Sequence, residues 1–374
     1  ADGSQCVSLE QDGEGIHVRR WNVSTGKLLA EHLAPGTQDD ARPITGFLPL
    51  HDDVAEFMVI RGRRHVTVYG TDPWQVVRET SHVADISHWW NQSGATGLVL
   101  GLANGTVVIH GSSYEVASSV DAHPGEPIQR LAVSGDGKTL ATMGRDDAAG
   151  EIRMWSAQTG EQIGSPIPRP RMMDSIALSR TGKYLYLASS TGFEVHDVDT
   201  DTPERGRTDY VDYLVNGEFS PADEGLLAAF PFYGAAEVIP FWRVKSRPRV
   251  REVVRYDFGD TRGGTCVAFS PDGRRFAVGS QVNGEVQVWD ATTESHLWTF
   301  EQKGHIRDLE FSPDGTSLAA GSWRAGEDGR GIATIRLWDH SVMTSHGEPM
   351  TFRTSGWSYF SVGYDPTGEE VIAS

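Results

Sequence analysis

The chain has 374 residues and a formal net charge of −18. That length holds two ordinary domains or one large all-β domain, and 38% hydrophobic residues allow a packed core. A chain this acidic repels phosphate backbones and anionic membrane surfaces, so we expect neither a nucleic-acid partner nor a membrane partner.

Cysteines are scarce, since Cys6 and Cys266 are the two that the chain has. A secreted disulfide framework would use more, and two thiols fit a reducing compartment. No apolar run reaches the roughly 18 residues that a membrane-spanning helix needs. These features predict a cytoplasmic location.

In chain order, a turn residue followed by a short apolar strand recurs at intervals of about 41 to 53 residues. Glycine suits such turns because it tolerates a positive φ. The recurring turn positions are Gly3, Asp53, Gly94, Gly137, Gly182, Gly225, Gly273, Gly315 and Gly368.

The repeat is clearest over residues 265–300. "TCVAF" predicts an apolar strand, "SPDG" a turn, and "RRFAVGS" a second strand. "EVQVWD" alternates with period two, and "SHLWTF" predicts a fourth, more polar strand. Four short antiparallel strands with no helix to cover them bury their faces only against copies of the same unit.

Eight segments match the third strand of this unit. They are "IHVRRWN", "HVTVYG", "TVVIHG", "EIRMWS", "FEVHDV", "EVIPFWR", "EVQVWD" and "TIRLWD". A period of about 40 to 45 residues, four strands per period and a Trp-Asp ending are together typical of a β-propeller.

On these motifs the chain resembles WD-repeat (WD40-type) proteins with bacterial-type repeats, along nearly its whole length. The resemblance is most specific in repeats seven and eight, where "VWD" and "LWD" follow "SPDG". It is partial in repeats one and four and weak in the other repeats. It implies an all-β propeller of four-stranded antiparallel blades.

The resemblance also implies a buried network of a histidine before the first strand, a Ser or Thr on the second, an aspartate in the next turn and the tryptophan. Repeats eight and four supply the whole set. The candidates are His305, Ser322, Asp328 and Trp338 in repeat eight, and His123, Thr142, Asp147 and Trp155 in repeat four.

No motif predicts catalysis, a cofactor or a bound metal. The chain has no H-E-x-x-H, C-x-x-C, G-x-S-x-G or P-loop pattern. "DVDTDT" imitates a calcium loop with Asp197, Asp199 and Asp201, but its sixth position is Thr202, where that loop needs glycine. We interpret this segment as a turn after a third strand.

A basic stripe interrupts the acidic background in "RVKSRPRVR". Its members alternate, so on a strand all five would share one face. One interpretation is protection of a sheet edge, and the other is a docking site for an acidic partner or another domain of the same protein. The members are Arg243, Lys245, Arg247, Arg249 and Arg251.

Gly3 and Gly368 stand eight periods apart, which favours eight blades; a seven-bladed ring with an unpaired blade is the alternative. "WSYFSVGYD" supplies the first strand that repeat one lacks, and closing the ring in this way would leave no open edge. "EEVIAS" then duplicates the second strand already present in "SQCVSLE". Either one copy is displaced, or the chain continues into further blades.

We therefore expect residues 1–374 to form a single propeller that is a piece of a larger multidomain protein. The expected role is a non-enzymatic protein-interaction scaffold or ligand-sensing domain. Family analogy places such domains in signalling proteins, with a STAND ATPase or a kinase. The expected partner is a protein or another domain of the same polypeptide. The alternative is an enzyme or small-molecule binder that uses the central channel.

Overall fold

A computed structural model describes most of the chain, in a series of separate ranges. They are residues 5–11, 15–22, 27–35, 46–49, 56–61, 64–71, 74–91, 98–111, 115–144, 150–168, 173–189, 192–199, 202–206, 214–222, 226–231, 239–243, 253–254, 265–280, 284–293, 295–326, 331–339, 344–354, 362–364 and 370–373. Among these residues no helix is long and apolar enough to cross a membrane.

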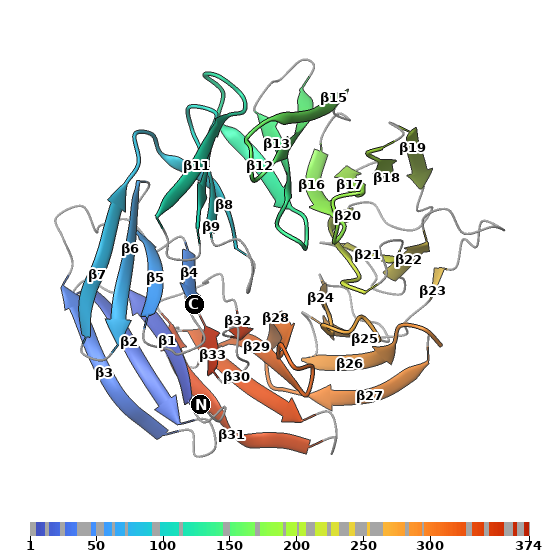
Figure 1. The fold of residues 1–374 in the computed structure, drawn as a ribbon. Coiled ribbons are helices and arrows are strands. Elements are labelled where there is room, and N and C mark those ends of the chain that lie inside the picture. The colour runs from blue at the N-terminus through green and yellow to red at the C-terminus, as the bar shows by residue number, and fades with distance from the viewer. Residues whose placement is uncertain are drawn as a thin grey trace. The chain divides into compact units, whose positions relative to one another are not determined.

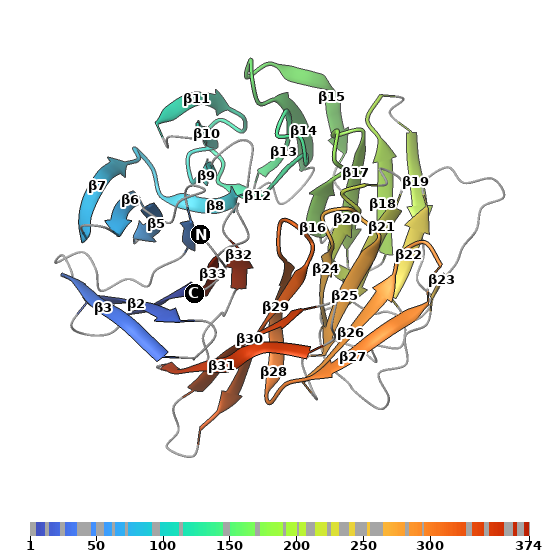
Figure 2. The same cartoon turned by 60° about the horizontal axis from the view of Figure 1, so that its bottom comes forward.

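The described strands form eight sheets, numbered here as blades 1 to 8 in chain order (Figures 1 and 2). The chain divides into two compact units, residues 1–82 with 265–374 and residues 83–264.

The first unit holds blades 1, 2, 7 and 8. Blade 1 consists of β1 (Gln5–Gln11), β2 (Gly15–Asn22), β3 (Lys27–Pro35), β32 (Val362–Tyr364) and β33 (Glu370–Ala373). Blade 2 consists of β4 (Gly46–Pro49), β5 (Glu56–Arg61), β6 (His65–Thr71) and β7 (Trp74–Ser81). Blade 7 consists of β24 (Thr265–Phe269), β25 (Arg275–Ser280), β26 (Glu285–Asp290) and β27 (His296–Glu301). Blade 8 consists of β28 (His305–Phe311), β29 (Ser317–Ala325), β30 (Gly331–Asp339) and β31 (Thr344–Thr354).

The second unit holds blades 3 to 6. Blade 3 consists of β8 (Ile86–Asn91), β9 (Leu98–Leu102), β10 (Thr106–His110) and β11 (Val116–Asp121). Blade 4 consists of β12 (Ile128–Val133), β13 (Thr139–Gly144), β14 (Glu151–Ser156) and β15 (Gln162–Pro168). Blade 5 consists of β16 (Met173–Leu178), β17 (Tyr184–Ser189), β18 (Gly192–Asp197) and β19 (Thr202–Gly206). Blade 6 consists of β20 (Leu214–Phe219), β21 (Leu226–Pro231), β22 (Ile239–Arg243) and β23 (Val253–Val254).

Each blade from 2 to 8 has four antiparallel strands with sequence neighbours side by side. All eight segments identified as third strands lie on strands, from β2 to β30. The predicted fold class, an all-β fold of four-stranded antiparallel propeller blades, is confirmed: the described residues form eight sheets, and blades 2 to 8 have four antiparallel strands each.

The turn between the first and second strands is held by its own side chains. In blade 4, Ser134 Oγ donates to Asp136 Oδ1 at 2.8 Å, and the same carboxylate accepts the backbone N–H of Lys138 at 3.0 Å. Thr139 N–H donates to Ser134 Oγ at 2.9 Å, and Gly137 has a φ of 69°. Glycine suits this turn because other residues rarely adopt that conformation. Equivalent bonds join Ser270 with Asp272 and Arg275, and Ser312 with Asp314 and Ser317.

These bonds also set the protonation of the turn carboxylates. Partial burial of Asp136 raises its pKa, but the hydrogen bonds from Ser134 and Lys138 act in the opposite direction and leave the pKa below its ordinary value. The pKa values of Asp272 and Asp314 are lowered in the same way. The hydrogen bonds within these turns therefore favour the charged form of each aspartate.

Neighbouring blades pack where a glycine of one faces an isoleucine of the next. A Cβ added at Gly101 on β9 would lie 2.6 Å from Ile128 Cγ2 on β12. At Gly279 on β25 it would lie 2.5 Å from Ile306 Cγ2 on β28. Since real Cβ atoms do not approach this closely, glycine is required for the observed spacing of the blades.

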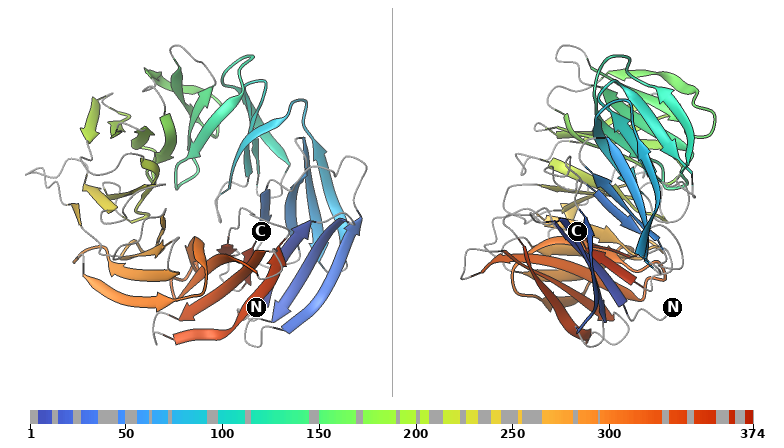
Figure 3. Two further views of the ribbon diagram at one scale, coloured as in Figure 1. Left: turned by 180° about the vertical axis from the view of Figure 1, so that it is seen from behind. Right: turned by 90° about the vertical axis from the view of Figure 1, so that its left-hand side faces the viewer.

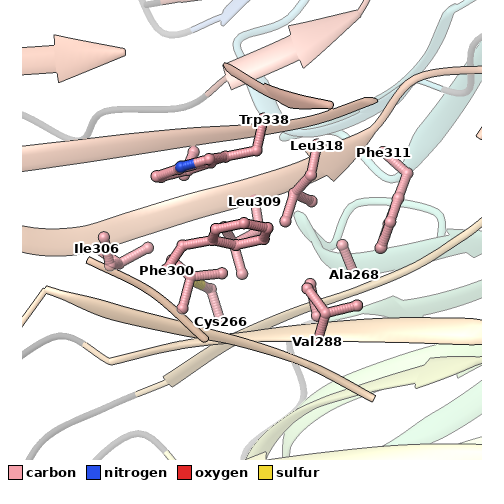
Figure 4. Close-up of a cluster of buried hydrophobic side chains, with 12 residues drawn as sticks. Cys266, Ala268, Val288, Phe300, Ile306, Leu309, Phe311, Leu318 and Trp338 are labelled. Carbon is pink, nitrogen blue, oxygen red and sulfur yellow. The ribbon is translucent and has the colours of Figure 1, made fainter. Parts of the chain in front are cut away.

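Blades 7 and 8 enclose an apolar cluster, shown in Figure 4. Phe300 of β27 stacks on the Trp338 indole of β30, with ring centroids 5.0 Å apart. Ile306 and Leu309 of β28 lie beside this pair (Figure 4). The tryptophan of the repeat signature thus packs against the outer strand of the preceding blade, so the two repeats stabilise each other.

Blade 1 has five strands, in the order β3-β2-β1-β33-β32. Figure 1 labels these strands, and Figure 3 shows the blue first strands of the chain beside its red last strands. The strand from "WSYFSVGYD" joins this sheet as β32, as its sequence predicts, but it pairs with β33. The strand from "EEVIAS" is β33, which lies between β32 and β1 and runs parallel to β1. Both copies of the second strand therefore lie in one sheet.

Candidate functional site

Blade 4 holds a buried polar network centred on Thr142 of β13. Trp155 Nε1 on β14 donates to Thr142 Oγ1 at 2.8 Å, and His123 Nε2 lies 3.1 Å from the same oxygen. Trp155 pairs with Leu140, so Thr142, two residues further along β13, faces the same side of the sheet as the indole. The structure therefore brings together three of the four residues expected in repeat four.

The surroundings favour the neutral form of His123. Burial lowers its pKa, and the charge of Arg153 acts in the same direction. Arg153 Nη1 is held in place by donating to Ala122 O at 2.8 Å. Neutral imidazole can accept a hydrogen bond from a hydroxyl, which suits a partner such as Thr142.

Blade 8 builds its network from a different residue. Gln302, directly after β27, donates from Nε2 to Ser322 Oγ at 2.7 Å and to Thr334 O at 2.9 Å. Ser322 Oγ donates to Lys303 O at 2.9 Å. In the described part of the chain, Ser322 thus bonds to Gln302 and not to the expected His305.

Strand register explains this difference. Trp338 pairs with Leu318, and the residue two places further along β29 is Ala320, which has no hydroxyl. Ser322 lies two residues beyond Ala320, so it takes a different place from that of Thr142 in blade 4. Trp338 is 3% exposed and is held by its stacking on Phe300. The assignment of Ser322 to the indole network in repeat eight is therefore corrected.

Gln302 could have been found in the sequence from its position in the repeat. It directly follows the outer strand of blade 7, and its backbone N–H donates to Gly284 O at 2.9 Å. His123 lies two residues after β11 of blade 3, and its backbone N–H, like that of Ala122, donates to Gly105 O at 3.0 Å. A search restricted to histidine passes over the glutamine, although both side chains reach a hydroxyl on the second strand.

Several predicted residues lie outside the described part of the chain. These include Asp147 and Asp328, the turn aspartates of repeats four and eight, and four members of the basic stripe. Arg243, the described member of the stripe, is the last residue of β22, which lies between β21 and β23 in the sheet of blade 6. The stripe residues outside the description are Lys245, Arg247, Arg249 and Arg251.

The described residues contain no group of three or more His, Cys, Asp or Glu that could hold a metal. In the calcium-like segment, the Asp199 N–H donates to Asp197 Oδ1 at 3.2 Å, which closes a turn after β18. Cys266 is a buried free cysteine, and burial raises the pKa of its thiol. A buried thiol of this kind is a core residue and a poor nucleophile.

Apolar side chains reach solvent mainly on the outer strands. Leu28, Leu29 and Leu33 of β3 are 44%, 51% and 41% exposed, and Val77 of β7 and Val116 of β11 are 44% and 51% exposed. Exposed apolar groups on the outer edge of a blade are suited to contacts with another protein.

Repeated antiparallel blades with a buried indole–hydroxyl network define a protein of the propeller class. The family model "WD domain, G-beta repeat" matches residues 262–290 and 295–330, which include β24 to β26 and β27 to β29. Domains of this kind generally mediate protein–protein interactions.

Curated relatives agree with this match. The chain is 30% identical over 111 residues to the Periodic tryptophan protein 2 homolog of Schizosaccharomyces pombe, which covers 29% of this chain and 12% of that protein. It is 34% identical over 93 residues to WD repeat-containing protein 1 of Mus musculus, which covers 24% of this chain and 14% of that protein. The matches thus span less than a sixth of either relative's length.

Proposed function

We propose that this chain is a non-enzymatic protein-interaction scaffold. The observation that carries the proposal is the match of two adjacent repeats, in blades 7 and 8, to the WD domain. The two blades share one apolar cluster, so they present their turns and outer strands from a fixed frame. A fixed frame lowers the entropy lost on binding a partner.

We further place the scaffold, or a ligand-sensing domain built on it, in a signalling protein of the cytoplasm. Family analogy with WD-repeat domains of STAND ATPases and kinases supports the signalling role. The content of two cysteines supports a reducing compartment. We take bacterial WD-repeat proteins as the relevant context, on the resemblance of the repeats to theirs.

The proposed docking site for an acidic protein partner is the basic stripe. It concentrates five positive charges within nine residues of a chain that otherwise carries a large negative excess. Complementary charge accelerates association and selects partners by sign.

Charge reversal tests this site. The variant R247E/R249E/R251E should bind more weakly the partners that the purified wild-type chain retains in quantitative affinity capture from a cell extract. The affinity of each retained partner should also depend less on salt in the variant, since fewer charge pairs remain to be screened. We expect folding to be unchanged, and urea unfolding of the variant and the wild type checks this.

The matched control is R64E/R78E/R180E, which makes the same change in charge at three exposed arginines elsewhere. This control should keep the wild-type set of partners. Equal capture by both triple variants would remove the stripe from the proposal. Capture no greater than on a matrix carrying an unrelated acidic protein would contradict the scaffold function itself.

A further inference from the structure

Blade 1 contains two strands that occupy the same position of the repeat. In the sequence, β1 follows "ADG" and β33 follows "DPTG", the turn motif that precedes second strands in the other repeats. Their backbones are register partners in a parallel pair, with Cys6 opposite Val371 and Val7 opposite Ile372. Repeat positions that are equivalent in sequence thus lie side by side in the sheet.

The first strand of this blade, β32, is also held by blade 8. The backbone N–H of Val362 on β32 donates to Asp308 Oδ2 on β28 at 3.0 Å. Val362 and Tyr364 are each 4% exposed and belong to a cluster with residues of blade 8. The other members of that cluster are Ala319, Ala333, Ile335, Leu337 and Met350.

β32 pairs antiparallel with β33, with Tyr364 opposite Val371 and Gly363 opposite Ile372. Because β33 is parallel to β1, β1 also runs antiparallel to β32. If β33 left the sheet and β1 moved by one strand spacing, about 4.8 Å, the same register would place Cys6 opposite Tyr364. The blade would then have the four-stranded antiparallel order of the other seven sheets.

We propose that β1 and β33 are alternative second strands for β32, so that blade 1 switches between a five-stranded and a four-stranded form. The five-stranded form holds β33 in the sheet, and the four-stranded form releases Glu370–Ala373 as a free extended segment. Two pairings must open, the parallel β1–β33 pair with four register pairs and the antiparallel β32–β33 pair with three. Antiparallel pairing of β1 with β32 replaces the second, so the pairing lost overall is the parallel one, which is the slightly weaker type per residue. This inference is independent of the scaffold proposal.

Disulfide trapping distinguishes the two forms, with Cys6 as the reporter. In a Cys266→Ala chain, Val371→Cys places a thiol directly opposite Cys6 in the five-stranded form. Tyr364→Cys places it two strands away, about 9–10 Å, which exceeds the Cα separation of about 7 Å that a disulfide can span. In the four-stranded form the thiol at position 364 becomes the direct neighbour of Cys6.

The matched control is Leu28→Cys. Leu28 of β3 pairs with Trp21 of β2, which pairs with Cys6, so position 28 is also two strands from Cys6 and is exposed. No exchange brings positions 6 and 28 together. Catalysed oxidation of the monomer should therefore give the 6–371 bond quickly, the 6–364 bond more slowly and the 6–28 bond at background level, as read by peptide mass spectrometry.

Weakening β33 should shift the balance. Ile372→Pro removes a backbone donor from that strand, so the yield of the 6–364 bond should rise several-fold and the 6–28 bond should not change. If Tyr364→Cys disturbs folding, the pair V7C/G363C in a Cys6→Ser chain reports the same register. A 6–371 bond with no 6–364 or 7–363 bond above the control, with or without the proline, overturns the proposal. Failure of every pair, 6–371 included, overturns the sheet on which it rests.

Discussion

At the scale of single residues, the buried hydroxyl of Thr142 is the centre of the blade 4 network. It accepts the indole N–H of Trp155 and contacts the ring of His123, and all three side chains are less than a tenth exposed. Buried polar groups are costly unless they are paired, so each member depends on the others. The network links the start of the blade to its second and third strands.

The lowered pKa of His123 makes the stability of the protein depend on pH. Its pKa is depressed in the folded state, so below about pH 6.5 the unfolded chain binds the proton more readily. The free energy of unfolding should therefore fall as the pH drops through that value. His123→Gln keeps a group that can bond to Thr142 but cannot titrate, so part of this fall should disappear in urea unfolding at about pH 7.5 and 5.5.

Trp155→Phe is the control for this measurement. It removes the indole donor and lowers stability at both pH values, but it leaves His123 free to titrate, so the wild-type pH dependence should remain. The same loss of stability on acidification in wild type and H123Q would show that His123 does not contribute.

The residues of the network were predictable to different degrees. The resemblance to WD repeats identified His123, Thr142 and Trp155, because blade 4 keeps the expected residue types at the expected places. In blade 8, Ala320 replaces the hydroxyl and Gln302 supplies the donor, a combination that no histidine-based pattern contains. The residue of β29 that takes the place of Thr142 is set by the register between β29 and β30. The lengths of the loops around β29 do not allow that register to be predicted from the sequence.

At the scale of strands, close packing between blades depends on glycine. Gly279→Ala would place a Cβ 2.5 Å from Ile306 Cγ2 and 2.8 Å from Cys266 Sγ, so β25 and β28 would have to separate. We expect a loss of about 1–3 kcal/mol in the free energy of unfolding, measured in urea, as is typical of overpacked cores.

A double-mutant cycle checks the cause. Ile306→Ala removes the clashing methyl group, so Gly279→Ala should cost less in that background than in wild type. If the losses in the free energy of unfolding of the two single variants simply add in the double variant, the glycine is required by the backbone conformation of β25 and not by the packing of the two blades.

Strand identity was more predictable than strand pairing. Strand patterns at the repeat spacing identified all eight third strands, and Trp-Asp endings marked two of them, because a half-buried strand requires alternation of apolar and polar residues. The five-stranded order of blade 1 was not predictable, because two second strands with the same pattern compete for one place. Their pairing joins residues 5–8 to 370–373 and depends on contacts that β32 makes with blade 8.

At the scale of the whole molecule, the large excess of negative charge opposes folding. The chain has 51 acidic and 33 basic residues, and like charges repel more strongly when the chain is compact. The blades must therefore be held by burial and strand pairing against this repulsion. The lowered pKa values of the turn aspartates keep those groups charged. The same carboxylates thus accept the hydrogen bonds of the turns and contribute to the negative charge.

Added salt should consequently stabilise the protein. Raising the ionic strength from about 0.01 M to 0.15 M shortens the Debye length from about 30 Å to 8 Å, which screens repulsion across the molecule. The midpoint of thermal unfolding, followed by tryptophan fluorescence, should rise by several degrees over this range. Each substitution in the R64E/R78E/R180E variant lowers the net charge by two, so the midpoint of this variant should rise more with salt than that of the wild type. A midpoint that falls with salt, or a response that is the same in the variant and in the wild type, would show that local ion pairs such as Arg19–Glu31, at 2.8 Å, outweigh the net charge.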